Sequence, residues 1–344
     1  MKRIRVAQIG VNRYSHSTEI FNTMKSMPDL FEIVGYAIVE DERETCADKL
    51  TTFKGYREMT VEEILSDPTI DAVTVETDEI HLLKYARMVA EAGKHMHMEK
   101  PGSQSVADFE ALTDTVKANG TVLHIGYMYR YNPMISDLLS RAEAGELGEI
   151  HSIEAHMSRL DRAPCREWLG SFKGGMMFYL GCHLVDLIYL LQGEPTRVIP
   201  INKSTGLDDI HSEDFGFAAL EYPNGVSFVR MSGTETGGFD RRQLVICTDQ
   251  RTVEVKPLEI SVPKEERLPG MVAPLYTECI ERFKNTEGKV STKYTRSPDF
   301  GRYDAMMKSF AAMVRGEKKN PFTCDYELNL FKLIMKCCGV VEDD

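Results

Sequence analysis

The sequence predicts an α/β fold in two parts: an N-terminal domain with a parallel sheet, then a C-terminal α+β domain with a mostly antiparallel open sheet. In the first third, short apolar runs alternate with helical stretches, and repeated strand–helix units imply a parallel sheet with helices on both faces. Beyond residue 150, most strand-like runs follow one another without a helix between them. The length of 344 residues suits two domains, which we place at 1–125 and 126–344.

The expected elements of the first domain are bounded by glycines and helix caps. Strands are predicted at 4–9, 31–39, 72–75, 95–98 and 122–125, and helices at 17–25, from residue 60, at 79–92 and at 105–118. Gly10 ends the first strand, whereas Gly93 and Gly120 follow helices.

The second domain is predicted to hold strands at 150–157, 215–222, 226–231, 244–248 and 252–255, with helices at 133–144, 177–191 and 303–314. Pro223-Asn224-Gly225 between two of these strands is a hairpin turn signal. The stretch 256–274 carries four prolines, which indicates a surface loop.

Composition excludes several classes of protein. With 41 basic and 53 acidic residues the formal net charge is −12, which opposes non-specific binding to nucleic acid or anionic membranes. There is no run of eighteen apolar residues and no signal-peptide pattern. The eight cysteines form neither a disulfide scaffold nor a C-x-x-C motif. We therefore expect a cytoplasmic protein with reduced thiols, no nucleic-acid or membrane partner, and no metal site.

The turn after the first strand, Gly10-Val11-Asn12-Arg13-Tyr14-Ser15, stands where a dinucleotide fingerprint would stand. In that motif, glycines let backbone amides approach a pyrophosphate at a helix N-terminus. Only the first glycine is kept here, because Asn12 and Ser15 occupy the other two positions. The Asn12 side chain takes room that phosphates would use, so an ordinary strand–helix turn remains an alternative.

Glu40 follows the second strand, in the range of ~20–30 residues beyond the glycine where an acidic residue can bond the adenosine ribose hydroxyls. Its charge would repel the extra phosphate of NADP, so the sequence favours NAD(H) over NADP(H). The alternative for 40–42 is a solvated acidic turn.

Glu99-Lys100-Pro101 ends another strand. A lysine just outside the carboxyl end of a parallel sheet lies where such sheets bind ligands. If burial lowered its pKa, its amine could exchange a proton with a substrate hydroxyl. Without further context, a surface lysine is the simpler interpretation.

Six segments, in this order, resemble the glucose–fructose oxidoreductase / inositol dehydrogenase / MocA (Gfo/Idh/MocA) family of NAD(P)-dependent oxidoreductases. They are the turn at Gly10, then 71–81, 92–101, 126–133, 174–186 and 325–338. The resemblance implies a Rossmann domain that binds NAD(P) and a second domain whose open sheet supports the substrate and often an oligomer interface. We therefore expect a homo-oligomer, either a dimer or a tetramer.

The resemblance also implies site residues. Lys100 matches the family lysine and His183 the family histidine, and both would handle the proton of the reacting hydroxyl. The residues expected near the cofactor are Gly10, Asn12, Arg13, Tyr14, Glu40, Thr77, His81, Glu99 and Lys100.

Tyr179 is a departure from the family pattern, in which many dehydrogenases carry an aspartate four residues before the histidine. A phenol with a pKa near ~10 accepts a proton less readily at neutral pH than a carboxylate does. We keep Tyr179 as a catalytic candidate that donates to the substrate or joins a proton relay, with simple packing as the alternative.

The remaining substrate-binding candidates combine aromatic and charged side chains, which suits a carbohydrate with apolar faces and hydroxyl edges. They are Tyr129, Arg130, Arg159 and Trp168, beside Tyr179 and His183. The alternatives are a core position for Trp168 and a solvated face for each arginine.

The sequence thus predicts an NAD(H)-dependent oxidoreductase that transfers hydride between nicotinamide and a secondary alcohol of a sugar, glycoside or polyol. One alternative is an enzyme that retains NAD and cleaves a glycosidic bond through transient oxidation. Another is a catalytically silent sugar sensor on the same fold, which Asn12 and Tyr179 favour and which Lys100 and His183 oppose.

Overall fold

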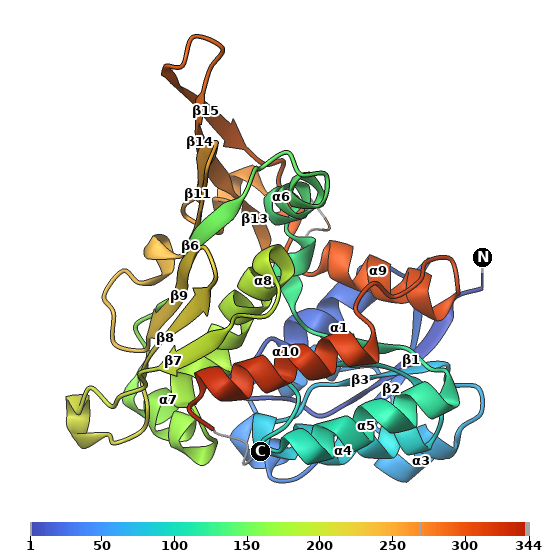
Figure 1. The fold of residues 1–344 in the computed structure, drawn as a ribbon. Coiled ribbons are helices and arrows are strands. Elements are labelled where there is room, and N and C mark those ends of the chain that lie inside the picture. Colours follow the sequence, from blue (N-terminus) through green and yellow to red (C-terminus); the bar gives the residue numbers. More distant parts are fainter. Residues whose placement is uncertain (1, 268–269, 271, 341–344) are drawn as a thin grey trace. The chain divides into compact units, whose positions relative to one another are not determined.

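The computed structural model describes residues 2–267, 270 and 272–340, and these form two compact units. The first unit is built mainly from the chain up to Met128 and from Gly301–Phe331 (Figure 1). The second is built mainly from Tyr129–Arg267, from Pro274–Phe300 and from residues 332–340.

The first unit holds the predicted five-stranded parallel sheet, in the order β2-β1-β3-β4-β5. Its strands are β1 (Ile4–Ile9), β2 (Phe31–Ala37), β3 (Ala72–Val75), β4 (His95–Met98) and β5 (Leu123–Ile125). The strand order reverses between β1 and β3, and open α/β sheets bind ligands outside the carboxyl ends of the strands at such a point. The residues that follow β1 and β3 therefore mark the expected ligand edge.

Helices cover both faces of this sheet, so the inner strands β1, β3 and β4 are buried along almost their whole length. The helices of the unit are α1 (Ser17–Lys25), α2 (Glu42–Thr45), α3 (Val61–Ser66), α4 (Glu79–Glu91), α5 (Val106–Asn119) and α9 (Asp304–Val314). In Figure 1, α1 and α9 lie on one side of the sheet and α4 and α5 on the other. Thr60 caps α3 through a capping box with Glu63, and Gly120 ends α5 with φ of 62°.

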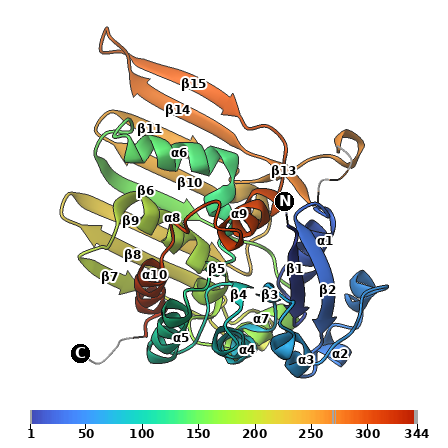
Figure 2. The ribbon, with the colours of Figure 1, turned by 90° about the vertical axis from the view of Figure 1, so that its right-hand side faces the viewer.

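The second unit holds an eight-stranded sheet in the order β15-β14-β11-β10-β6-β9-β8-β7 (Figure 2). Its strands are β6 (Ile150–His156), β7 (Arg197–Pro200), β8 (Phe215–Tyr222), β9 (Gly225–Ser232), β10 (Gln243–Thr248), β11 (Arg251–Val255), β14 (Glu278–Lys284) and β15 (Val290–Arg296). Neighbours are antiparallel except for β6 and β9. The predicted hairpin is confirmed, because Tyr222 pairs with Gly225 across Pro223 and Asn224.

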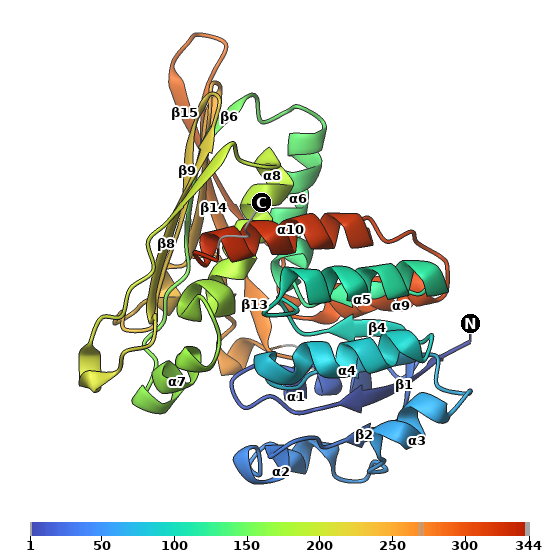
Figure 3. The same cartoon turned by 60° about the horizontal axis from the view of Figure 1, so that its bottom comes forward.

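Helices α6 (Pro133–Glu143) and α8 (Cys182–Gln192) lie along one face of this sheet (Figure 3). The unit also contains α7 (Ala163–Trp168), and α10 (Cys324–Cys337) runs from the first unit into the second. Short strands β12 (Ile260–Ser261), β13 (Pro274–Tyr276) and β16 (Phe300–Gly301) make a separate small sheet. Short 3₁₀ turns are η1 (Leu50–Phe53), η2 (Met128–Tyr131), η3 (Leu169–Ser171), η5 (Leu207–Asp209), η6 (Phe239–Arg241) and η7 (Lys264–Glu266).

The structure differs from the sequence-based expectations in several places, and α2, α7 and β7 are among the elements that were not predicted. The strand predicted over 31–39 ends at Ala37. The helix predicted over 177–191 begins as a π-helical turn, η4 (Met177–Gly181), and becomes α-helical only at Cys182. The β14–β15 hairpin was not predicted, because its residues are largely polar and β15 is exposed along most of its length. The predicted loop 256–274 contains β12 and η7, and its residues 268, 269 and 271 lie outside the described residues.

None of the helices in the described part of the chain combines the length and apolar character that crossing a bilayer requires.

Candidate active site

Gly10 makes the turn that leaves β1. Its φ of 90° is in the region that favours glycine, and an added Cβ would lie 2.6 Å from the Cβ of Thr77 and 2.7 Å from the Thr77 backbone nitrogen. The ends of β1 and β3 are therefore packed against each other, and only glycine fits between them.

Asn12 is buried, and its side chain organises the turn. Its Oδ1 accepts hydrogen bonds from the backbone N–H of Tyr14 (2.8 Å) and of Ser15 (3.1 Å). Its Nδ2 donates to the Thr77 carbonyl and, at 2.7 Å, to Oε2 of Glu79. The asparagine at the second glycine position thus holds the turn amides and links them to the start of α4.

Glu42 was not predicted as a site residue, yet it is buried directly beneath the turn. Its Oε2 accepts the backbone N–H of Val11 (2.9 Å) and of Val39 (3.1 Å), and its Oε1 accepts the Thr77 hydroxyl at 2.5 Å. Burial raises the pKa of Glu42 to about 7, although these hydrogen bonds oppose the rise. The solvated-turn interpretation is therefore wrong for Glu42, and no sequence signal distinguishes it from its acidic neighbours.

Lys49 and Ser15 bring polar groups to the same turn. The Lys49 ammonium donates to the carbonyls of Asn12 (2.7 Å) and Ser15 (3.0 Å), and burial lowers its pKa. The Ser15 hydroxyl is buried and has no hydrogen-bond partner among the described residues. A cation and an unsatisfied donor within one glycine turn are the groups that a phosphate would bind.

Glu40 follows β2 with φ of 50°, and its side chain is partly exposed. Its Oε1 accepts hydrogen bonds from Lys84 Nζ (2.6 Å) and from the Tyr85 hydroxyl (2.7 Å), and His81 Nδ1 lies 3.9 Å away. The bonds from Lys84 and Tyr85 lower the pKa of Glu40, so it is ionised at neutral pH. Within the described residues, Oε2 accepts no hydrogen bond and is available to a ligand hydroxyl.

The remaining predicted cofactor residues surround the same edge of the sheet. Thr77 is buried, Arg13 is exposed with its guanidinium 5.5 Å from the Tyr14 ring centroid, and His81 is partly exposed in the first turn of α4.

Lys100 is only 5% exposed, so its interpretation as a surface lysine is wrong. Its Nζ lies 3.5 Å from Oε1 of Glu99 and 3.9 Å from Oε1 of Glu79. Burial raises the pKa of Glu79 to about 8, even though Lys100 opposes the rise. The lysine thus faces one carboxyl group, that of Glu79, whose pKa lies close to neutral pH.

In the second unit, His183 lies in the first turn of α8 and is buried. The Tyr129 ring packs edge-on against its imidazole with centroids 5.2 Å apart. The Tyr129 hydroxyl in turn donates to Glu259 at 2.9 Å. The two predicted residues are therefore neighbours, with Tyr129 fixed from its far end.

Tyr179, four residues before His183, lies in the η4 turn and is buried. Its hydroxyl accepts a hydrogen bond from Arg159 Nη1 at 3.3 Å, and Trp168 packs edge-on against its ring at 5.1 Å. Arg159 is also ion-paired with Asp161, whose pKa burial raises. Three predicted residues, Arg159, Trp168 and Tyr179, thus form one cluster.

Arg130 does not join this cluster. Its guanidinium makes a bidentate bond to Asp186, with Nε 3.0 Å from both carboxylate oxygens and Nη2 2.7 Å from Oδ1. Both side chains are buried. Because Asp186 lies one turn after His183 on α8, this pair holds the helix that carries the histidine.

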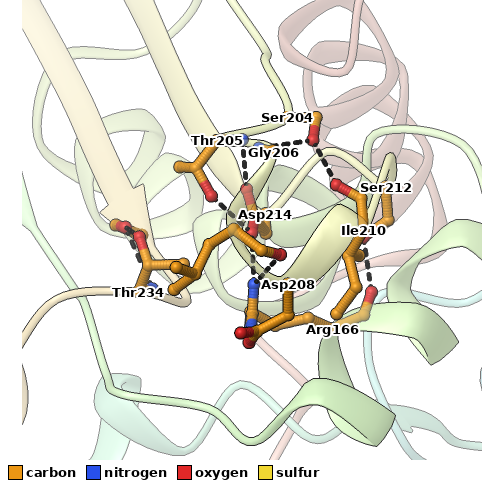
Figure 4. A network of polar contacts seen from close by, with 11 residues as sticks. Arg166, Ser204, Thr205, Gly206, Asp208, Ile210, Ser212, Asp214 and Thr234 are labelled. Atoms are coloured by element: carbon orange, nitrogen blue, oxygen red, sulfur yellow. Dashed lines mark hydrogen bonds and ion pairs between the residues drawn. The ribbon is translucent and has the colours of Figure 1, made fainter.

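A second network of polar contacts joins α7 to the loop before β8 (Figure 4), and this loop also contacts the glycine turn that precedes η4. The buried Arg166 of α7 bonds Asp214 (3.3 Å) and is ion-paired with Asp208. Asp214 also accepts the backbone N–H and the hydroxyl of Thr205, both at 2.8 Å. Next to Asp214, the Glu213 carbonyl accepts the Met176 amide, where a Cβ on Gly175 would lie 2.3 Å from that oxygen.

The residues of the first unit fit a dinucleotide. The Gly10 turn excludes a Cβ, the Ser15 hydroxyl is a buried donor without a partner, and Glu40 presents a carboxylate oxygen at the end of β2. Among the described residues, no group of three or more His, Cys, Asp or Glu side chains is arranged to hold a metal ion.

Two family models match the chain. The model described as "Oxidoreductase family, NAD-binding Rossmann fold" matches residues 4–127, and the "GFO/IDH/MocA C-terminal domain" model matches residues 137–254. Together they span most of both units.

Characterised proteins are similar over part of the chain. Scyllo-inositol 2-dehydrogenase (NAD(+)) of Bacillus subtilis is 30% identical over 192 residues, which are 54% of this chain and 56% of that enzyme. D-xylose 1-dehydrogenase (NADP(+)) 2 of Haloferax volcanii is 29% identical over 168 residues, 48% of this chain and 51% of that enzyme. The matched part is thus little more than half of each relative.

Solved structures share the fold over nearly the whole chain. The aldose-aldose oxidoreductase of Caulobacter crescentus, at 17% identity, superposes with a TM-score of 0.77 and covers 98% of this chain and 97% of its own. With both family models matched and the expected sheets in place, the chain belongs to the Gfo/Idh/MocA family of NAD(P)-dependent oxidoreductases.

Proposed function

We propose that this protein is an NAD(H)-dependent dehydrogenase that acts on a secondary alcohol of a sugar, glycoside or polyol. The observation that carries the proposal is the shared edge of the first unit's sheet: the Gly10 turn, the Glu40 carboxylate and the buried Lys100 all follow carboxyl ends of its strands. Cofactor-binding groups and a proton-transferring amine on one sheet edge are what hydride transfer from an alcohol requires.

The preference for NAD(H) rests on Glu40. Its pKa is lowered, so it carries a negative charge at neutral pH, and its Oε2 can accept from a ribose hydroxyl. The 2′-phosphate of NADP would bring a second negative charge to the same place. Because Lys84 partly compensates the carboxylate, we expect discrimination of about tenfold or more rather than complete exclusion.

For the chemistry, the bound nicotinamide supplies the hydride acceptor or donor. Oxidation of the alcohol also releases the hydroxyl proton, which Lys100 takes up as an amine and returns as an ammonium in the reverse direction. His183 bonds the reacting hydroxyl, and the Arg130–Asp186 pair fixes the helix that carries it. The Tyr179 hydroxyl, held by Arg159, serves as a hydrogen-bond donor to the substrate.

The substrate class is supported by two features. The cluster of Trp168, Tyr179 and Arg159 offers an aromatic surface beside a guanidinium, which suits a carbohydrate ring and its hydroxyls. Relatives named as inositol and xylose dehydrogenases act on polyhydroxylated substrates of this kind. We also propose a homo-oligomer. Helices α6 and α8 cover one face of the eight-stranded sheet. Phe217 and Phe228 are stacked within that sheet and remain partly exposed, and a second copy of the chain would bury them.

Calorimetric titration with NAD, NADH, NADP and NADPH is the first test. We expect NAD or NADH to bind at least about tenfold more tightly than its phosphorylated counterpart, and Glu40→Gln to reduce that ratio. Failure to bind any dinucleotide would contradict the proposal and favour the sensor.

Turnover on a panel of sugars and polyols is the second test. Lys100→Met and His183→Ala should each lower kcat by 10²-fold or more. Lys94→Met is the matched control, because Lys94 is also a buried lysine of the unit but bonds the carbonyls of Asp67 and Ile70 before β3. Glycoside cleavage without net NADH would instead indicate the enzyme that retains NAD.

A further inference from the structure

A row of polar side chains crosses the interior of the first unit's sheet. The strand register places Gln8 of β1 opposite Thr74 of β3, Thr74 opposite His97 of β4, and His97 opposite His124 of β5. All four are at most 2% exposed. They share one face of the sheet, the face of α1 and α9, since Gln8 donates to the Ser17 carbonyl and the His124 ring stacks on Phe310.

Two carboxyl groups continue this row at the ligand edge. Glu76 follows Thr74 by two residues and Glu99 follows His97 by two residues, so both side chains return to the same face. The parallel pairing persists there, because the Glu76 amide donates to the Ile9 carbonyl and the Glu99 amide to the Val75 carbonyl. Glu76 and Glu99 thus directly follow the adjacent strands β3 and β4, and they are 0% and 7% exposed.

Glu76 is not compensated as a charged group. Neither of its carboxyl oxygens has a hydrogen bond within the described residues. Burial raises the pKa of Glu76 well above its usual value, and the charge of Glu99 raises it further. The other charged groups that act on it are Lys100, which lowers its pKa, and Glu79 of α4 and Glu19 of α1, which raise it. Two adjacent carboxyls in such a place cannot both ionise.

The histidines complete a consistent arrangement of protons. His97 Nε2 lies 3.4 Å from Oε1 of Glu76, and His97 Nδ1 lies 2.7 Å from His124 Nδ1. Burial lowers the pKa of His97 to about 3, so its ring is neutral and carries one proton. If Glu76 is a carboxylic acid whose O–H points at Nε2, the His97 proton sits on Nδ1 and bonds His124.

We propose that the buried carboxyls of Glu76 and Glu99 hold one proton between them at neutral pH, carried by Glu76, and that this carboxyl pair exchanges a proton with Lys100. The second half of the inference rests on the proposed function. Lys100 Nζ is 3.5 Å from Glu99, which is next to Glu76, so the three groups form one path from the sheet interior to the ligand edge. Glu76 acts through Lys100 and is a positioning residue for the proton.

The proton balance of an oxidation is then complete. An N–H proton of the Lys100 ammonium moves to the ionised carboxylate of the pair, which leaves an amine and two neutral carboxyls. The amine takes the hydroxyl proton of the substrate while the carbinol hydride leaves for the nicotinamide. The extra proton leaves the pair through Glu99, the slightly exposed member, to water.

The first experiment detects the shared proton without cofactor or substrate. In infrared difference spectra of the full chain at neutral pH, Glu76→Gln should remove the absorption of one protonated carboxyl. Glu281→Gln is the matched control, since Glu281 is buried but held by Arg141 and Arg251, which contribute to its lowered pKa. Glu76→Leu serves the same comparison if the glutamine variant does not fold. An unchanged carboxyl absorption in both variants would overturn the proposal.

The second experiment tests the link to Lys100, again without turnover. The absorption assigned to Glu76 should disappear as pH rises, and Lys100→Met should move that midpoint upward by about one pH unit or more, because a nearby positive charge is lost. Lys84→Met, at the exposed Glu40 pair, should leave it unchanged. No shift with Lys100→Met would overturn the exchange path.

Where turnover is measurable, Glu76→Gln should shift the pH profile of kcat and leave KM unchanged, whereas lost packing alone would not move the profile. If the infrared results hold but no dinucleotide binds, the carboxyl pair stands and the proposed function fails.

Discussion

At the scale of single residues, the turn after β1 is organised by Asn12, which stands at a glycine position of the dinucleotide fingerprint, and by the buried Glu42. Asn12 bonds two turn amides, and Glu42 bonds a third from below. Both also reach the segment after β3, through Thr77 and Glu79. The turn is therefore held in one conformation without a ligand, and this reduces the entropic cost of binding.

Glu42 makes this turn sensitive to pH. Its pKa in the folded chain, about 7, lies above the ordinary value of 4.5, so the folded state binds more protons between these values. Stability from this group is therefore lost as pH rises through that window, by up to about 3 kcal/mol.

Glu42→Gln should abolish this contribution, so the variant gains stability relative to the parent as pH rises from 5 to 8. Urea unfolding at several pH values measures it. Glu281→Gln is the control: its pKa is lowered, so it should change stability without changing the slope in this window. An equal slope for parent and Glu42→Gln would contradict the assignment.

At the scale of elements, the position of α8, the helix that carries His183, depends on the segment that precedes it in the chain. The π-helical turn η4 precedes it, and Gly181 sits where an added Cβ would lie 2.6 Å from the sulfur of Met177. π-helical turns occur often at functional sites, since they offset the residues before and after them on the helix surface. Tyr179 is therefore not placed relative to His183 as an ideal α-helix would place it.

Arg166 holds the loop before β8 through Asp208 and Asp214, and this loop contacts the segment that precedes η4. Removing the guanidinium in Arg166→Met leaves the fully buried Asp214 without its cation and should cost about 3–5 kcal/mol of unfolding free energy. The double variant Arg166→Met/Asp214→Asn should recover much of the loss. Asp208→Asn, at the exposed end of the network, should cost no more than about 1 kcal/mol.

Denaturant unfolding of the parent, Arg166→Met, Asp214→Asn and the double variant gives the coupling energy between Arg166 and Asp214. Additive effects of the two single changes would show that the pair does not act as a unit.

At the scale of the whole molecule, the chain passes between its two units several times. Residues 301–331 return to the first unit, and α10 starts in the first unit and ends in the second. A helix shared in this way cannot unfold in one unit and persist intact in the other. We therefore expect cooperative unfolding of both units.

Cofactor binding should then stabilise the entire chain. At a concentration of NADH one hundred times its Kd, the free energy of unfolding should rise by about 2.7 kcal/mol. Calorimetry should show a single transition that moves to higher temperature, with a smaller shift for NADPH at the same concentration. Two transitions, of which only one responds, would contradict the cooperative picture.

The sequence by itself determined the parallel sheet, its glycine turns and the antiparallel sheet that follows. These depend on local periodicity, capping residues such as Thr60 and the hairpin at Pro223-Asn224-Gly225, which neighbouring residues largely settle. It also singled out Lys100, because a lysine at a strand end is visible in the order of residues.

Only the tertiary structure decided which acidic residues are buried and what they bond. Glu40, Glu42, Glu76 and Glu79 look alike in the sequence, yet one is an exposed ion-paired carboxylate and three are buried with raised pKa values. Their difference arises from partners far along the chain, from Val11 to Lys100, and from strand register across β1, β3 and β4. Desolvation and charge proximity depend on distances that no local pattern encodes.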